Sequence, residues 1–206
     1  MIKAVFFDFD GVLTKDKTGS TTTTRYISEK AGLEPSAVKA AFARHNDALT
    51  LGKTSHSEVW REICDELGRP LSLGLLQEAF ASTPMNEGML GVARELRRTH
   101  AVGVITDNKK DRIDFLRRRH GLDALFDPIV VSAEVGGDKS GQEIFLAALR
   151  ISGVRASEAL FIDNSEANLA VPGALGMRTC LHDDEKNDIP ALIGRLRELG
   201  IAISDA

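Results

Sequence analysis

The sequence contains few cysteines and few aromatic residues with a polar atom: of 206 residues, two are cysteine, one is tryptophan and one is tyrosine. Cys64 and Cys180 lie far apart and in no metal-ligand spacing, so we expect neither a disulfide framework nor a cysteine-bound metal. This cysteine usage fits a reducing compartment, and a cytoplasmic location is expected.

Long apolar runs are also missing. The apolar stretch at the N-terminus meets acidic residues at Asp8 and Asp10, too early for the core of a signal peptide. No segment approaches the apolar length of a membrane span. We therefore expect a soluble protein with no membrane partner.

Charge of one sign is not concentrated in any long segment. The formal net charge is -4, and no block of like charges is long enough to form a charged tail. The most basic spot, Arg117 to Arg119, is followed by His120 and Gly121, as at a helix C-terminus, where cations suit the helix dipole. A solvated helix end is favoured over a nucleic-acid site, and no nucleic-acid partner is expected.

Short apolar runs alternate with helical patterns along most of the chain. The runs read as buried parallel strands at Lys3–Phe9, Ala101–Thr106, Pro128–Ser132, Ala159–Asp163 and Met177–Leu181. The helical patterns end at or near glycine and cover Lys109–His120, Gly141–Ile151, Glu166–Leu175 and Ile189–Leu199. Strands that alternate with single helices predict an α/β fold with a doubly wound parallel sheet.

One section breaks this alternation. From about Thr18 to Ser82 no strand is evident, and Thr21–Thr24 reads as a loop or the start of a helix. Apolar residues at helical spacing occupy Ala37–Leu49, Ser57–Leu67 and Leu73–Phe80. We predict an all-helical insertion at residues 17–83 within a core domain of residues 1–16 and 84–206. The connections are expected near Thr14–Lys17 and Thr83–Asn86.

Ligands of such sheets bind beyond the carboxyl ends of the strands. The polar residues at those ends are therefore candidates for one shared site. The set comprises Asp8, Asp10, Thr106, Asp107, Asn108, Asp163 and Asn164, with Lys139 at the start of a helix. Asp8 and Asp10 are two residues apart on a predicted strand, so their side chains are expected to point the same way and share a site. Two close carboxylates need a compensating cation, and Mg²⁺, which prefers oxygen ligands, would supply it.

These residues resemble the four motifs of the haloacid dehalogenase (HAD) superfamily. The segment Asp8-Phe9-Asp10-Gly11-Val12-Leu13-Thr14 is similar to the first motif, and Thr106 after a buried strand is similar to the second. Lys139 resembles the third, and Phe161-Ile162-Asp163-Asn164-Ser165 resembles the fourth. The helical insertion follows the first motif, where a helical cap of this superfamily lies. The resemblance covers nearly the whole chain.

The resemblance implies a Mg²⁺-dependent phosphatase acting on a small phosphorylated metabolite. Asp8 would attack phosphorus and form an aspartyl-phosphate, and Asp10 would move protons as acid and base. The implied catalytic residues are Asp8, Asp10, Thr106 and Lys139, and the implied phosphate-binding residues are Thr106, Asp107, Asn108 and Lys139. The implied metal ligands are Asp8, Asp10, Asp163 and Asn164. Dehalogenating members typically lack the second aspartate, so Asp10 favours phosphoryl transfer.

Three positions depart from the family pattern. Asn164 stands where a second acid is common, which predicts weaker metal binding or a transfer of that role to Asp163 or Glu166. Asp107 stands where a neutral residue is usual, and Ser140 replaces a usual proline. Asn164 and Asp107 leave a degenerate phosphate-binding protein open as an alternative. A phosphomutase of the same superfamily also stays open, because it uses the same core. The oligomeric state cannot be derived from the sequence.

Other candidate sites are weaker. The segment around Lys139 is not a Walker phosphate loop, because Asp138 stands where that motif needs glycine. His182-Asp183-Asp184 reads as a solvated loop in preference to a metal site. Four polar residues of the helical insertion could reach a substrate, namely Arg25, His45, Asn46 and Lys53.

Overall fold

The computed structural model of the chain describes residues 1–203 and has a central sheet of five parallel strands. The strands are β1 (Ala4–Phe7), β2 (Ala101–Thr106), β3 (Ile129–Val131), β4 (Ala159–Asp163) and β5 (Arg178–Leu181), in the order β3-β2-β1-β4-β5. The predicted parallel sheet is confirmed. β1 ends two residues earlier than predicted, because the chain turns through Phe9–Leu13 directly after Asp8.

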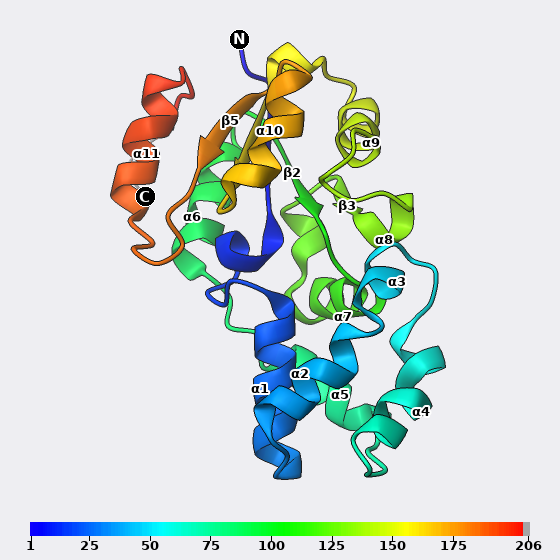
Figure 1. Ribbon diagram of the computed structural model, residues 1–206. Helices are drawn as coiled ribbons and strands as arrows, with labels where there is room; N and C mark the ends of the chain where they lie inside the picture. Colours follow the sequence, from blue (N-terminus) through cyan, green and yellow to red (C-terminus); the bar gives the residue numbers. More distant parts are fainter. Residues whose placement is uncertain (204–206) are drawn as a thin grey trace.

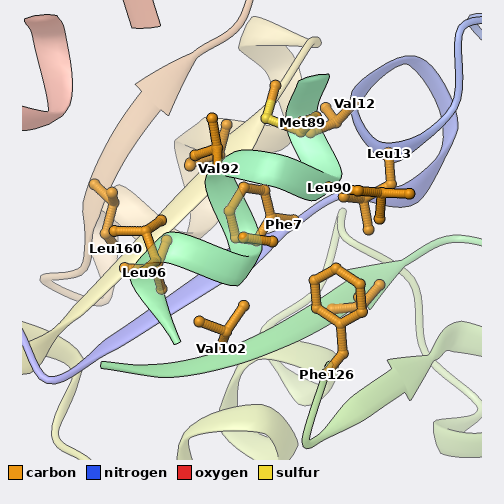
Figure 2. Close-up of a cluster of buried hydrophobic side chains, with 14 of the residues drawn as sticks. Phe7, Val12, Leu13, Met89, Leu90, Val92, Leu96, Val102, Phe126 and Leu160 are labelled. Carbon is orange, nitrogen blue, oxygen red and sulfur yellow. The ribbon is translucent and has the colours of Figure 1, made fainter. Parts of the chain in front are cut away.

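Helices cover both faces of this sheet. α6 (Glu87–Leu96), α7 (Lys110–His120) and α11 (Ile189–Glu198) pack on one face, and α9 (Glu143–Ser152) and α10 (Glu166–Ala174) pack on the other. Side chains of β1 alternate between the two cores, with Val5 and Phe7 on the first face and Phe6 on the second. Figure 2 shows the first core, where Phe7 lies among side chains of α6 and meets Phe126 edge to face, with ring centroids 6.2 Å apart.

From Thr18 to Ser82, where no strand was predicted, the regular elements are all helices. These are α1 (Gly19–Ala31), α2 (Pro35–Ala43), α3 (Asn46–Thr50), α4 (His56–Glu66) and α5 (Leu73–Ala81). They enclose a core of their own, with Ile27, Ile63 and Phe80 almost fully buried. Figure 1 shows α1, α2, α4 and α5 below the sheet, on the side where β2 ends. The division into a core domain of 1–16 and 84–206 and a domain of 17–83 stays a prediction.

Several elements differ from the predictions. The predicted helix Ala37–Leu49 is broken near His45, which separates α2 from α3. The threonine-rich segment Thr21–Thr24, for which the sequence predicts a loop or the start of a helix, lies inside α1. The first turn of α1 is capped by the Thr18 side chain, which accepts from Thr21 N. α6 was not predicted. A short helix, α8 (Ser132–Val135), follows β3, and single 3₁₀ turns cover Leu122–Ala124 and Ala156–Glu158.

The two connections between the sheet and the insertion lie side by side. Thr14 pairs with Met85 in an isolated antiparallel bridge. Lys15 N donates to Pro84 O at 2.9 Å, and Asn86 N donates to Leu13 O at 2.9 Å. The insertion therefore leaves and rejoins the core through one short two-stranded link, beside the end of β1.

The helices are short. The longest within residues 1–203, α1, has 13 residues. In this described part of the chain, none is both long and apolar enough to cross a bilayer, which needs about 20 residues.

Candidate active site

The centre of the site is a buried lysine between two carboxylates. Lys139 Nζ lies 2.8 Å from Asp8 Oδ1 and 2.7 Å from Asp163 Oδ2, and the three side chains are 3%, 8% and 0% exposed. Asp8 directly follows β1 and Asp163 ends β4, and these strands are neighbours in the sheet. Burial opposes a charge on Lys139, but the two carboxylates raise its pKa above the ordinary value, so the ammonium stays charged.

Asp8 is the acid whose ionisation is most affected by this setting. Burial raises the pKa of Asp8 to about 7, Lys139 acts in the lowering direction, and Asp163 adds to the rise. The backbone holds Asp8 in place, since its N–H donates to Ile162 O at 2.8 Å. A further cation beside Asp8 would favour the ionised form, which is the form that can act as a nucleophile.

Asp163 has hydrogen bonds on both of its carboxylate oxygens. Oδ1 accepts from Ser165 N at 2.7 Å, and Oδ2 accepts from Lys139. The amide of Asn168 donates to both oxygens at 3.2 Å. Asp163 therefore fixes the position of Lys139, and a metal ion would compete with these donors for its oxygens. The metal-ligand role expected for Asp163 stays a prediction, and Asn168 is a site residue that was not predicted.

Asp10 is held by an arginine that was not predicted either. The two terminal nitrogens of Arg112 lie 2.9 Å and 2.8 Å from the two carboxylate oxygens of Asp10. Asn108 links the pair, since its amide donates to Asp10 Oδ2 at 2.8 Å and accepts from Arg112 at 3.0 Å. The side chain of Arg112 is only 2% exposed. A signal was available in the sequence, because an arginine in the first turn of a helix opposes the helix dipole and so needs a specific partner.

The residues after β2 connect several parts of the site. Thr106 ends β2 and is 1% exposed. The backbone N–H of Asn108 donates to Ser132 Oγ at 2.9 Å. The carboxylate of Asp107 accepts from the backbone N–H of Lys139 at 2.9 Å, so this acid fixes the loop that carries the lysine. Burial raises the pKa of Asp107, while Lys139 acts in the opposite direction. The phosphate-binding roles of these residues stay predictions.

The atoms that could hold a cation here are oxygens. They include the second carboxylate oxygen of Asp8, the main-chain carbonyl of Asp10 and the side-chain amide of Asn164. Asn164 packs directly on Gly11, where a Cβ would collide with its amide and where φ is +79°. Within residues 1–203, no three His, Cys, Asp or Glu side chains group as a metal cluster. This donor set fits Mg²⁺, which prefers oxygen ligands and keeps several waters. Asp8 supplies the only carboxylate of the set.

Of the four insertion residues considered in the sequence, Asn46 contacts the segment that follows β2. Asn46 Oδ1 accepts from Lys109 Nζ at 2.8 Å, and Lys109 precedes α7. Arg25 pairs with Asp16 at 2.6 Å, and His45 lies 3.9 Å from Glu62 within the insertion. Lys53 is exposed. Asn46 is thus the member of this set that lies next to the candidate site.

Further contacts close the insertion over the core. His56 Nδ1 lies 2.9 Å from both carboxylate oxygens of Asp111, and the rings of Phe80 and Phe115 lie 6.1 Å apart. Ser132 Oγ donates to Thr50 O at 2.8 Å. The guanidinium of Arg112 lies against Gly19 at the start of α1, where a Cβ would collide with it. Arg112 therefore contacts both the insertion and Asp10.

The loop after β5 (Arg178–Leu181) carries His182 and Asp183. The His182 side chain is buried, and burial lowers its pKa. Asp183 pairs with Lys186 at 2.8 Å. The predicted solvated loop is confirmed for Asp183, which is exposed, and is wrong for His182, whose side chain is buried.

Solved structures share this architecture. A predicted HAD-like family hydrolase from Porphyromonas gingivalis is 26% identical, with a TM-score of 0.73 over 96% of this chain and 98% of its own. A HAD family enzyme from Bacteroides thetaiotaomicron, in complex with magnesium and inorganic phosphate, is 20% identical, with a TM-score of 0.73 over 89% and 96%. A 2-haloacid dehalogenase from Pseudomonas syringae is 21% identical, with a TM-score of 0.66 over 95% and 99%. The last two, at this identity, show the fold alone.

The family comparison covers most of the chain. The family described as haloacid dehalogenase-like hydrolase matches residues 2–176, which include Asp8, Thr106, Lys139 and Asp163. The sheet, the motif residues at its carboxyl edge and this match agree with each other. The chain belongs to the haloacid dehalogenase-like hydrolases.

Proposed function

We propose that this hydrolase is a Mg²⁺-dependent phosphatase that cleaves a small phosphate monoester through an aspartyl-phosphate at Asp8. The observation that supports it best is the buried ammonium of Lys139, 2.8 Å from Asp8 and 2.7 Å from Asp163. A fixed cation beside the attacking carboxylate suits a reaction in which negative charge gathers on phosphoryl oxygens. Asp10, two residues after Asp8, supplies the acid and base that such a reaction needs.

The proposed reaction has two steps. A carboxylate oxygen of Asp8 forms a bond to phosphorus while the bond from phosphorus to the leaving oxygen breaks, and Asp10 gives that oxygen a proton. A water molecule then attacks the phosphorus of the aspartyl-phosphate and gives a proton to Asp10, which releases phosphate and restores Asp8. Lys139 stabilises the phosphoryl oxygens in both steps.

Asp10 must leave Arg112 to donate a proton. Its two oxygens now accept three N–H groups, two from Arg112 and one from Asn108. A proton on either oxygen would remove one of these acceptors. Because Arg112 also touches Gly19 of the insertion, we expect movement of the insertion on substrate binding to release the acid.

A metal ion would be held by Asp8, the Asp10 carbonyl and Asn164. When bound, Mg²⁺ would neutralise charge between the nucleophile and the phosphate. With one available carboxylate in this set, the protein contributes little charge to the metal, and we expect weak binding without substrate.

Dehalogenation is the second candidate. A halide leaves a carbon atom without needing a proton, so dehalogenation requires no acid. In this structure Asp10 is bonded to Arg112 through both carboxylate oxygens and is not positioned to donate a proton. A nucleophilic Asp8 with Lys139 beside it would serve such a reaction equally well. The presence of Asp10 itself, which this chemistry does not use, favours the phosphatase.

The experiment is hydrolysis of an aryl phosphate with and without Mg²⁺, by the parent and by Asp8→Asn, beside halide release from a 2-haloacid. Magnesium-dependent phosphate release that the variant lacks supports the phosphatase. If the aryl ester is not cleaved, a panel of phosphorylated metabolites follows. If no phosphate is released from any metabolite of the panel, the proposal is contradicted. Halide release would then favour the dehalogenase. Phosphate binding without turnover would favour a degenerate binding protein.

A further inference from the structure

Lys109 lies at the seam between the core and the insertion, directly after Asn108. Its backbone N–H donates to Asn108 Oδ1 at 3.1 Å. Its Nζ reaches across the seam and donates to Asn46 Oδ1 on α3 at 2.8 Å. Lys109 is thus held at its backbone by Asn108 and at its side-chain end by Asn46, and Asn108 also donates to Asp10.

Lys109 has no acidic partner of its own, unlike the other two cations of the site. Lys139 pairs with two carboxylates and Arg112 pairs with Asp10. Among residues 1–203, the only side-chain acceptor of Lys109 Nζ is the neutral amide of Asn46. Burial lowers the pKa of Lys109, and the charge of Arg112 lowers it further, while Asp10 and Asp107 act in the opposite direction. Asp111 acts in the same direction as Asp10 and Asp107, but within residues 1–203 none of these three carboxylates accepts a hydrogen bond from Lys109 Nζ. A partly buried ammonium with no carboxylate bonded to it is costly, so an anion at this position is favourable.

We propose that Lys109 and Asn46 are specificity residues, which bind a carboxylate on the leaving portion of the substrate. One ammonium that has no carboxylate bonded to it matches a singly charged carboxylate. A half-turn of the Asn46 amide would present its N–H to the second carboxylate oxygen, beside the N–H of Lys109. A substrate bound in this way would touch the core and the insertion together, and so would replace the present contact between them. The proposal depends on the phosphatase function proposed for Asp8.

A purely structural contact between Lys109 and Asn46 makes a different prediction. If the pair only closes the insertion, its loss changes the affinity for all phosphate ligands by a similar factor. If it binds a carboxylate, its loss changes the affinity for acidic ligands alone.

The test uses two non-hydrolysable phosphonates that differ only in a terminal carboxylate or carboxamide. Their affinities for the parent, Lys109→Met, Lys109→Arg and Lys110→Met are measured by calorimetry with Mg²⁺ present. Lys110 is the matched control, because it is the next residue, loses the same charge and pairs at the surface with Asp114 and Glu134. We expect the parent and Lys110→Met to bind the acid roughly 10- to 100-fold more tightly than the amide. Lys109→Met should bind both alike, and Lys109→Arg should retain a preference for the acid.

Two results overturn the proposal. The first is that the parent binds the acid and the amide with equal affinity, or binds neither. The second is that Lys109→Met keeps the preference of the parent for the acid. The phosphatase function is judged separately by turnover of aryl and metabolite phosphates. Turnover without acid preference contradicts the role of Lys109 alone, and acid preference without turnover contradicts the phosphatase alone.

Discussion

Arg112 and Asp10 form a two-point ion pair, with nitrogen–oxygen distances of 2.9 Å and 2.8 Å, beneath the start of the helical insertion. The Arg112 side chain is 2% exposed and that of Asp10 is 14% exposed. The residue expected to transfer protons is therefore held by a buried guanidinium in the closed structure. This pair links the position of the insertion to the availability of the acid.

Replacement of Arg112 by methionine should lower the free energy of unfolding by roughly 3 kcal/mol, because it leaves Asp10 as a poorly solvated charge without its partner. Denaturant unfolding of the parent and Arg112→Met measures this loss. The double variant Asp10→Asn/Arg112→Met should recover part of it, since the unpaired charge is then gone. Strictly additive losses in the double variant would show that the two side chains do not interact.

Replacement of Asn164 by aspartate should tighten Mg²⁺ binding about tenfold, because a carboxylate replaces an amide of the same shape against Gly11 in the proposed metal site. Calorimetry with Mg²⁺ measures the change. Asn168→Asp is the matched control: its amide donates to both oxygens of Asp163, so a carboxylate there would repel Asp163 and should not improve binding. Equal affinities in the parent and Asn164→Asp would exclude Asn164 from the metal site.

Asp111 should make a small contribution to stability that disappears in acid. Burial acts to raise its pKa, but the hydrogen bond and charge of His56 outweigh this and hold it below the usual range. A depressed folded-state pKa stabilises the protein above the unfolded value of about 4, and the stabilisation is lost as the pH falls through the folded value. Because Asp111 is 38% exposed, we expect less than about 1 kcal/mol. The difference in melting temperature between the parent and Asp111→Asn should shrink from pH 6 to pH 3, and a constant difference would contradict this.

The insertion should lose substantial stability when its own core is opened. Ile63 is fully buried there, and Ile63→Ala should cost roughly 2–5 kcal/mol. Trp60, the only tryptophan of the sequence, lies in the same cluster, so its fluorescence reports on the insertion while circular dichroism reports on the whole chain. Separate transitions by the two probes would support the predicted domain of residues 17–83. Coincident transitions would show that the insertion and the core unfold together.

The sequence predicted those parts of the site that depend on the chain order. A polar residue at the end of a parallel strand must lie at one edge of the sheet, which was enough to group Asp8, Thr106 and Asp163. The alternation of strands and helices likewise predicted the sheet. The four motifs in order, at Asp8, Thr106, Lys139 and Asp163, then indicated the family.

Contacts between distant helical residues could not be predicted in the same way. The partner of Asp10 is 102 positions along the chain, and the partner of Lys109 lies in a short helix that exists only because the helical pattern breaks near His45. Helical periodicity gives the buried face of a helix but not the residue that it meets. α1 was missed as a complete helix for a local reason: its threonine-rich sequence has low helix propensity, and its Thr18 cap and packing on α5 overcome this.

The central claim is that Asp8 carries the phosphoryl group. The most direct measurement is rapid quenching of the parent during turnover of a phosphate ester with Mg²⁺, followed by peptide mass spectrometry of the phosphorylated protein. We predict a phosphoryl group on the peptide that contains Asp8, and none in Asp8→Asn. Turnover with no phosphoryl group on Asp8 at any quench time, or with the group on another residue, would contradict the account.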